Sequence, residues 1–422
     1  MRILNLIVSS AAMLSSGMVL AQSGPTSLQA AFERARLVDP LFLAGKAEFE
    51  ADSQAARSSS WAFIPQAKVS SGQVDTDGGG RRDSLTITQP ILSADRMATF
   101  KEGEPRTRLA EAKMALREVD LAKRLYSAFA EMAQARESLK QNKARLSALE
   151  LQLTSAKRLL SLSQGTTTDV RDAEVKLLQA RGEELSLRGQ LQSAERRYVS
   201  IVGTLPNGAA LEISPAKAKK IADAAAKLGQ HLPNSTVMAD KHPTVALARA
   251  ETQLAELDAD RARSAWMPEL NLVHTRTRLE GNSNSFTGLN LSLPLSASNY
   301  ASLQSAGAKA VMSAQESADA TRNIVLEIEQ LKTSVEFGAN QVAMQQAAVE
   351  AAELSVEANE KSFKGGVRSQ TDVLNSIDVL YTVKGELIKS LLQLSDNLLK
   401  LSLIEGTKAS ESLADIEQLV LH

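Results

Sequence analysis

The chain has 422 residues, and 48 Lys and Arg stand against 49 Asp and Glu, so its formal net charge is −1. Such a balance lacks the basic stripe of a nucleic-acid-binding protein, and 43% hydrophobic residues are too many for a disordered chain. Cysteine is absent, which excludes disulfides, thiolate metal sites, a catalytic cysteine and a lipid anchor on cysteine. Aromatic residues make up only 4%, a composition typical of long helical rods rather than compact cores.

The first residues have the layout of an export signal. Arg2 gives a positive start, residues 3–20 are apolar or small, and Ala21 before Gln22 fits a cleavage site. We therefore expect residues 1–21 to be a signal peptide. No later stretch reaches the roughly 18–20 apolar residues of a membrane-spanning helix. We expect an exported chain without a helical or lipid anchor.

Landmark residues recur in the same order at an offset of 203 or 204 residues, which predicts an internal duplication. The matching pairs are Asp39-Pro40 with His242-Pro243, Pro65 with Pro268, Gln89-Pro90 with Leu293-Pro294, Thr168-Asp169-Val170 with Thr371-Asp372-Val373, and Gly203-Thr204 with Gly406-Thr407. One pair could arise by chance, but five in order indicate a repeated unit. We therefore expect a first repeat at 22–208, a linker or equatorial segment at 209–240, a second repeat at 241–408 and a tail at 409–422.

Each repeat begins with a helix of medium length, expected at 27–60 and at 243–265, and a proline follows each helix. Two segments of alternating residues come next, which predict strand pairs at 66–91 and 268–295. In the second pair, leucines alternate with polar residues over 289–295. This period of two is typical of strands.

Long polar segments complete each repeat and predict helical hairpins at 95–203 and 298–404. A helix of about 69 residues is about 100 Å long at a rise of 1.5 Å per residue, which exceeds any compact domain. Apolar residues recur at three- and four-residue steps, as in Leu146, Leu149 and Leu153. The hairpins are therefore expected to be antiparallel coiled coils.

Four short strands cannot close a membrane barrel alone, because a spanning barrel leaves no edge and needs about eight strands or more. Three copies with four strands each would supply twelve, and the helical hairpins would continue them as a tube. The predicted fold is therefore mostly α with a small β part. It consists of a duplicated helix–β–β–long-helical-hairpin unit that assembles as a trimer.

This order of elements resembles the TolC family of outer-membrane channels. The resemblance covers residues from about Ser27 to Leu419. It is most specific over Lys361–Asn375, which is similar to the Gly-x-x-x-x-x-Asp-Val-Leu hairpin turn of the family. The first turn, at Leu162–Arg171, reads as two residues shorter. The resemblance implies a homotrimer with a 12-stranded outer-membrane β-barrel and an α-helical periplasmic tunnel, hence a location in the cell outer membrane with a long periplasmic extension.

The resemblance further implies a passive exit duct that works with a periplasmic adaptor (membrane fusion) protein and an inner-membrane pump, either ABC-type or proton-driven. Type I protein secretion is favoured by the Asp-Pro start of the repeat and the missing lipid-anchor cysteine. Drug or small-molecule efflux would use the same architecture. A secreted coiled-coil structural protein is a more distant alternative, since it does not explain strand pairs at the same place in both repeats.

By position, the resemblance assigns the hairpin turns to the periplasmic entrance. The residues expected to dock the adaptor are Gly165, Thr168, Asp169, Val170, Gly365, Gly366, Thr371 and Val373. Asp372, repeated three times, would form a ring of charge that favours cations. Arg368 matches the family position that links helices in the closed state.

Two departures from the family pattern affect this entrance. Asn375 stands where the family has a second acid, so the ring would carry three charges rather than six. Phe363 replaces a tyrosine and has no hydroxyl for a hydrogen bond in the closed state. A simpler role for Asp169 and Asp372 is N-capping of the following helix.

The sequence offers no enzyme chemistry, cofactor site or metal site, because no catalytic motif appears and the histidines are scattered at 231, 242, 274 and 422. Arg276 and Arg278 alternate with threonines in a predicted strand. We expect them to face the lumen or to lie near the membrane rim, and a salt bridge or an ordinary solvated face is an equal alternative. No chemistry is assigned to residues 209–234.

Overall fold

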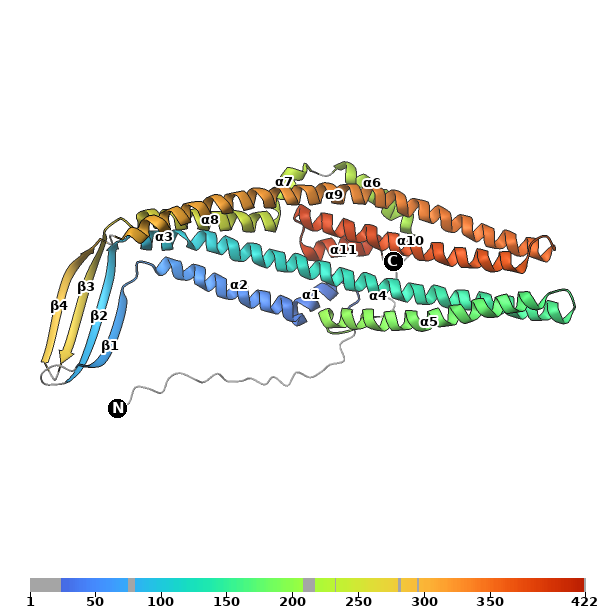
Figure 1. Ribbon diagram of the computed structural model, residues 1–422, viewed down its shortest axis with the longest axis horizontal. Helices are drawn as coiled ribbons and strands as arrows, with labels where there is room; N and C mark the ends of the chain where they lie inside the picture. The colour runs from blue at the N-terminus through green and yellow to red at the C-terminus, as the bar shows by residue number, and fades with distance from the viewer. Residues whose placement is uncertain are drawn as a thin grey trace.

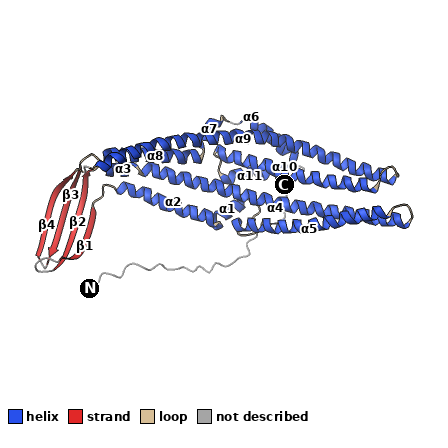
Figure 2. Cartoon of the chain, viewed as in Figure 1, coloured by secondary structure: helices blue, strands red, loops and turns tan. Residues whose placement is uncertain are grey.

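A computed structural model describes residues 24–74, 80–207, 217–231, 233–279, 282–293 and 296–420 of the chain. The expected signal peptide lies outside these described residues. The molecule is a long rod, with a small β-sheet at one end and the turns of two helical hairpins at the other (Figure 1). Most of the chain is helical and a small part is strand (Figure 2), so the predicted fold class is confirmed.

The order of helix, strand pair and long hairpin occurs twice along the chain. The first set of elements comprises α1 (Leu28–Val38), α2 (Pro40–Ser58), the 3₁₀ helix η1 (Ser59–Trp61), β1 (Gln66–Val74), β2 (Gly80–Leu92), α3 (Ala94–Lys101), α4 (Gly103–Ser161) and α5 (Thr167–Val202). The remaining elements are α6 (Ala218–His231), α7 (Ser235–Lys241), α8 (Pro243–Ser264), β3 (Glu269–Leu279), β4 (Asn282–Ser292), α9 (Ala297–Lys364), α10 (Gln370–Glu405) and α11 (Ala409–Val420).

Two helices that the sequence predicted as continuous are divided. The helix expected at 27–60 breaks at Asp39, whose backbone is extended with φ −65° and ψ 117°, because Pro40 disfavours helical geometry in the residue before it. The helix expected from residue 95 onward breaks at Glu102. Pro105 follows in the first turn of α4 and has no N–H to donate to the turn before it, so α3 and α4 are separate segments.

Helices also occur in two segments where the sequence predicted none. α6 lies in the expected linker and packs on α9, and α11 forms most of the expected tail and packs on α1. Glu417 of α11 accepts a hydrogen bond of 2.8 Å from the backbone N–H of Leu28. Figure 1 shows these helices around the middle of the rod. They cover the main hydrophobic core, to which Ile221 of α6 and Leu413 of α11 belong.

The rest of this core comes from the long helices. Tyr126 and Phe129 of α4 are fully buried in it, with ring centroids 6.0 Å apart. A second, smaller cluster lies toward the hairpin turns and joins α4, α5 and α10. None of the helices in the described ranges is both long and apolar enough to cross a membrane.

The four strands form one antiparallel sheet in the order β1-β2-β3-β4. The two strand pairs meet between β2 and β3, where Thr86 pairs with Thr275, and a register shift lies between Pro90 and Leu92. Within this chain, β1 and β4 are the edge strands. The register divides the side chains into two faces.

One face of the sheet, here called the leucine face, carries exposed apolar side chains at the end near the helices. These residues are Ala67, Val69, Leu85, Ile87, Leu272, Leu289 and Leu291, together with the half-buried Leu270. The other face, here called the polar face, carries mainly hydroxyl and amide side chains. It includes Gln66, Ser70, Ser84, Thr86, Thr88, Asn271, Thr275, Thr277, Asn284 and Asn290.

Candidate functional site at the hairpin turns

The turn between α4 and α5 is closed by a pair of backbone hydrogen bonds. The N–H of Ser163 donates to the carbonyl of Leu160 at 3.0 Å, and the N–H of Gln164 donates to the carbonyl of Leu159 at 2.9 Å. Ser163 has a left-handed backbone with φ 57°. This is the Schellman arrangement, which satisfies carbonyls at the end of a helix and usually has glycine at the left-handed position.

The turn between α9 and α10 has the same arrangement. The N–H of Gly366 donates to the carbonyl of Phe363 at 2.9 Å, the N–H of Val367 donates to that of Ser362 at 3.0 Å, and Gly366 has φ 74°. The prediction that the first turn is two residues shorter is therefore wrong. Backbone geometry makes Ser163 the counterpart of Gly366, and the two turns have the same length.

Both helices after the turns begin with a capping box. Thr166 caps α5, and Asp169 accepts from the N–H of Thr166 at 2.9 Å and from its hydroxyl at 2.7 Å. Ser369 caps α10, and Asp372 accepts from its N–H at 3.0 Å and its hydroxyl at 2.8 Å. Each aspartate is thus the third helical residue rather than the N-cap itself, and it satisfies a backbone donor that would otherwise lack a partner.

Asp372 is held in its charged form. The side-chain and backbone hydrogen bonds from Ser369 lower the pKa of this carboxyl, and the charge of Arg368 lowers it further. Arg368 lies 3.9 Å from Asp372, and both side chains are substantially exposed. Among the described residues, Asp372 is the acid that pairs with Arg368. This ion pair therefore lies within the α9–α10 hairpin.

The other predicted residues divide into inward and outward groups. Val170 and Val373 are buried between helices, whereas Asn375 and Thr168 are exposed. Phe363 is half-buried, and its carbonyl takes part in the turn. Gly165 lies in the first turn, and Gly365, Gly366 and the half-buried Thr371 lie in or beside the second. The turns thus present backbone, the side chain of Thr168 and the exposed apolar side chains of Leu162 and Val367.

The structure also shows a contact between the two hairpins that the sequence did not reveal. One face of α10 presents Gln370, Leu374 and Asp378, one helical turn apart, to the facing turns of α4. Gln370 is buried and donates from Nε2 to the carbonyl of Gln152 at 2.9 Å. Leu374 packs with Leu149. We call these residues, with Asp378 and its partners, the hairpin seam.

Asp378 joins both helices of the other hairpin. Its Oδ1 accepts from Nη2 and Nε of Arg145 in α4 at 2.6 and 3.0 Å, and its Oδ2 accepts from Nζ of Lys176 in α5 at 2.6 Å. Arg145 also pairs with Glu183 at 2.7 Å. Side chains of Asp378, Arg145 and Lys176 are 20%, 18% and 31% exposed, so the pairs are partly shielded from water and stronger than surface pairs.

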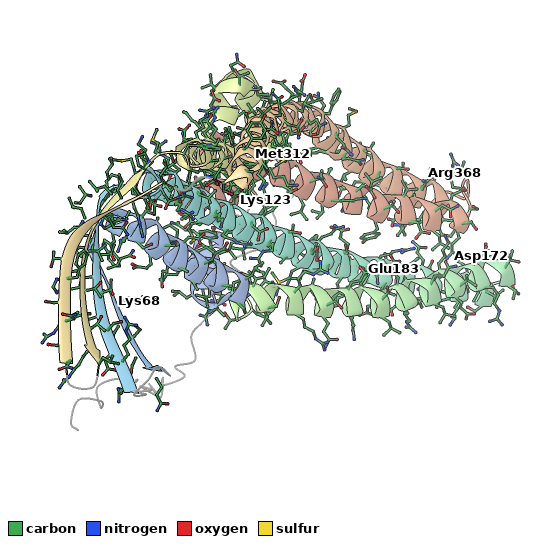
Figure 3. The ribbon with its side chains drawn as sticks, turned by 60° about the vertical axis from the view of Figure 1, so that its left-hand side comes forward. Lys68, Lys123, Asp172, Glu183, Met312 and Arg368 are labelled. Carbon is green, nitrogen blue, oxygen red and sulfur yellow. The ribbon has the colours of Figure 1, made fainter. Side chains whose placement is uncertain are left out.

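A polar groove of about 380 Å³ lies beside this cluster, between α4, α5 and α10. Gln141, Asn142 and Tyr381 line it together with Arg145 and Asp378. The groove gives water access to one side of the ion pairs. Figure 3 labels Glu183, which lies beside the seam, and Asp172 and Arg368, which lie near the turns of the two hairpins.

Comparisons with known proteins agree with this architecture. A family model described as "Outer membrane efflux protein" matches residues 237–407. The chain is 26% identical to "Proteases secretion protein PrtF" of Dickeya chrysanthemi over 72% of this chain and 68% of the relative. It is 22% identical to "Outer membrane protein TolC" of Vibrio cholerae over 91% of this chain and 92% of the relative.

Solved structures show the same fold. The structure of CusC matches with a TM-score of 0.75 at 14% identity, over 92% of this chain and 95% of that one. VceC of Vibrio cholerae matches with a TM-score of 0.72 at 16% identity, over 90% and 96%. The fold, the matching family model and the relatives are those of outer-membrane export channels, which this chain resembles. The predicted resemblance to the TolC family is thereby confirmed, as are the outer-membrane location, the periplasmic extension and the role of exit duct.

Proposed function

We propose that this chain is the outer-membrane duct of a type I protein-secretion system. The observation that carries the proposal is its similarity to two proteins named for protease secretion, PrtF and AprF. AprF of Pseudomonas aeruginosa is 21% identical over 79% of this chain. Drug or small-molecule efflux is the second candidate, because BepC of Brucella suis, 24% identical over 63% of this chain, is named an efflux protein.

The working form that we propose is a homotrimer. In one copy, the outer edges of β1 and β4 have no neighbouring strand among the described residues. Backbone N–H and C=O groups at such an edge lack partners in lipid, which makes an open sheet untenable there. Three copies joined edge to edge would give twelve strands without an edge, with the leucine face toward lipid and the polar face toward a water-filled lumen.

At the other end, we propose that the hairpin turns receive a periplasmic adaptor, which connects the duct to an inner-membrane ABC pump. The residues offered to the adaptor are Gly165, Thr168, Asp169, Val170, Gly365, Gly366, Thr371 and Val373. The lowered pKa of Asp372 supports a ring of three negative charges at neutral pH. Asn375 adds no charge to this ring, and Arg368 balances part of it. The proposal assigns no catalytic residue, cofactor or metal.

The hairpin seam is proposed to hold the entrance closed, because it fixes the position of α10 relative to α4 and α5. Replacement of Asp378 by asparagine would remove the negative charge that two cations share. We expect Asp378→Asn to increase the conductance of the purified protein in planar bilayers. The matched control is Glu353→Gln, which removes an ion pair of 2.8 Å with Lys384 inside the α9–α10 hairpin. The control should conduct like the wild type.

Single-channel recording also tests the duct itself. If neither the wild type nor Asp378→Asn conducts after insertion has been verified, the duct is contradicted. Equal conductance of Asp378→Asn and the control would contradict the role of the seam alone. Cargo is tested by expressing the gene in a host without its own duct, together with either an ABC pump or a proton-driven pump and the cognate adaptor. Restored protein export supports type I secretion, and restored drug resistance without export supports the second candidate.

A further inference from the structure

The leucine face changes character along its length. Near the helices it is apolar, but toward the strand loops it carries Ser71, Arg81, Asp83, Arg276, Arg278 and Ser285. Arg276 and Arg278 were expected either in the lumen or at the membrane rim, and the register assigns them to the leucine face. In the register of β2 and β3, Arg276 lies opposite Leu85 and Arg278 lies opposite Asp83.

The positive charges on this face exceed the negative ones. Asp83 is the acid on the leucine face within the described strands. It forms an ion pair of 3.1 Å with Arg81. Arg81, Arg276 and Arg278 are all exposed. Arg276 has no hydrogen bond or ion pair to any described residue, and its neighbours across the strands are Leu85 and Ser285. The loop end of the leucine face therefore presents guanidinium groups without enough acid to neutralise them.

The distance along the strands from the end of the sheet near the helices to the arginines matches the apolar thickness of a membrane. Trp61 and Trp266 are exposed and lie just before β1 and β3, and exposed tryptophans are enriched at membrane–water interfaces. Nine residue steps lead from Glu269, the first residue of β3, to Arg278, about 30 Å along the strand. A strand tilt of about 40° reduces this to about 23 Å, close to the height of about 25 Å of the apolar band on outer-membrane barrels.

A lipid-facing arginine costs about 2–4 kcal/mol at the middle of a bilayer and about 0–1 kcal/mol near its surface. Arg276 and Arg278 therefore fit the surface of the leaflet that surrounds the loop end of the sheet. An arginine side chain there can form two parallel hydrogen bonds with a phosphate group. Ser285, on the same face, adds a hydroxyl beside the arginines, whereas the hydroxyl of Ser71 donates to Asp83 at 2.6 Å.

We propose that Arg81, Arg276 and Arg278 form a binding site for the phosphate groups of anionic lipid at the outer edge of the apolar band. The inference rests on the proposed function, because it requires the sheet to be in a membrane with its leucine face toward lipid. In a trimer the site would occur three times around the barrel. It would fix the depth of the barrel and select phosphorylated lipids from the surrounding leaflet.

The test uses the full chain in nanodiscs of phosphatidylcholine with or without phosphatidic acid, and native mass spectrometry of the lipids retained after release into detergent. The site variant is Arg276→Gln with Arg278→Gln. The matched control is Lys68→Gln with Arg82→Gln, which removes the same charge from the polar face; Figure 3 labels Lys68. Since each arginine near an anionic surface contributes about fivefold, the site variant should lose more than tenfold in preference for phosphatidic acid, and the control should retain it.

Two results would overturn the lipid site. One is an equal loss, or no loss, in both variants, which would indicate net charge or no site. The other is complete displacement of phosphatidic acid by millimolar inorganic phosphate, which would identify a free anion as the ligand. Insertion of all three proteins into pure phosphatidylcholine discs is scored separately. If the wild type does not insert, the membrane duct itself is contradicted, which distinguishes the two failures.

Discussion

Asp39 and His242 hold the same position in the two repeats and cap the same kind of helix with different chemistry. Oδ2 of Asp39 accepts from the N–H of Phe42 at 2.9 Å, and Nδ1 of His242 accepts from the N–H of Thr244 at 3.2 Å. A proline follows each of them at the first helical position, and both side chains are buried.

The charged residues near Asp39 and His242 differ in sign between the two repeats. Arg124 binds Asp39 at 2.8 Å, and the residue 203 positions after Arg124 is Glu327, whose charge acts on His242. Burial raises the pKa of Asp39, but the hydrogen bonds from Arg124 and Phe42 and the charge of Arg124 outweigh it, so the pKa is lowered. The duplicated position thus keeps the cap, but Asp39 caps as a carboxylate paired with Arg124, whereas His242 caps as a neutral imidazole near Glu327.

His242 gives the first prediction. Burial and the charge of Lys123 lower its pKa below 6.5, against the opposing effect of Glu327. Below about pH 7 the unfolded chain therefore binds more protons at this site than the folded chain does. The free energy of unfolding decreases as the pH falls, until the pH has passed the lowered pKa of the folded state. His242→Asn keeps an acceptor at the cap position without a titrating group. Its melting temperature should fall less than that of the wild type between about pH 7.5 and about pH 5.5.

His274→Asn is the matched control, because His274 lies on the sheet and bonds Thr287 at 2.7 Å instead of capping a helix. Its pH dependence should resemble that of the wild type. If His242→Asn loses as much stability on acidification as the wild type, the titration of His242 does not govern this part of the profile.

At the scale of elements, the two hairpin turns share one backbone design but differ in one residue. Ser163 adopts φ 57°, where a side chain clashes with the backbone, and Gly366 adopts φ 74° without that cost. Ser163→Gly should therefore stabilise the first turn by about 1 kcal/mol, and Gly366→Ala should destabilise the second by about the same amount.

Hydrogen exchange of the turn amides measures both changes. The amide of Gln164 bonds Leu159 at 2.9 Å and the amide of Val367 bonds Ser362 at 3.0 Å. A change of about 1 kcal/mol alters local opening about fivefold, so Gln164 should exchange more slowly in Ser163→Gly and Val367 faster in Gly366→Ala. Unchanged exchange in both variants would show that the turns open together with their hairpins rather than locally.

The turns also show how far sequence patterns reach. Glycine is the usual residue at a left-handed helix end, so the serine at position 163 hides the likeness of the first turn to the second, although the constant offset of 203 residues matches Ser163 to Gly366. Strand pairs and hairpins were predictable from period and repetition. The breaks at Asp39 and Glu102 depend on single prolines nearby, and α6 and α11 are short helices that their packing partners stabilise.

At the scale of the whole molecule, the seam could not be predicted from one sequence. Gln370, Leu374 and Asp378 follow a visible helical spacing, yet the pattern does not reveal that α4 and α5 supply their partners. Arg145 and Lys176 lie more than 200 residues before Asp378 in the chain. Contacts of this range arise only when the two hairpins pack side by side, as they do in Figure 1.

The seam makes a final prediction about salt. Its ion pairs are partly exposed beside a polar groove, so added salt should weaken them by screening. Because the chain contains no cysteine, spin labels can be attached at Leu162→Cys and Val367→Cys, one in each exposed turn. With labelled chain diluted into unlabelled chain, the distance between the turns should lengthen as salt rises.

In Asp378→Asn, the same distance should already be long at low salt and should change little as salt rises. Glu353→Gln, which leaves the seam intact, should follow the wild type. This comparison separates electrostatic closure from packing, since the contact of Leu374 with Leu149 is present in all three proteins. A distance that ignores both salt and Asp378 would mean that apolar packing alone holds the two hairpins together, and that opening the duct requires separation of the leucines.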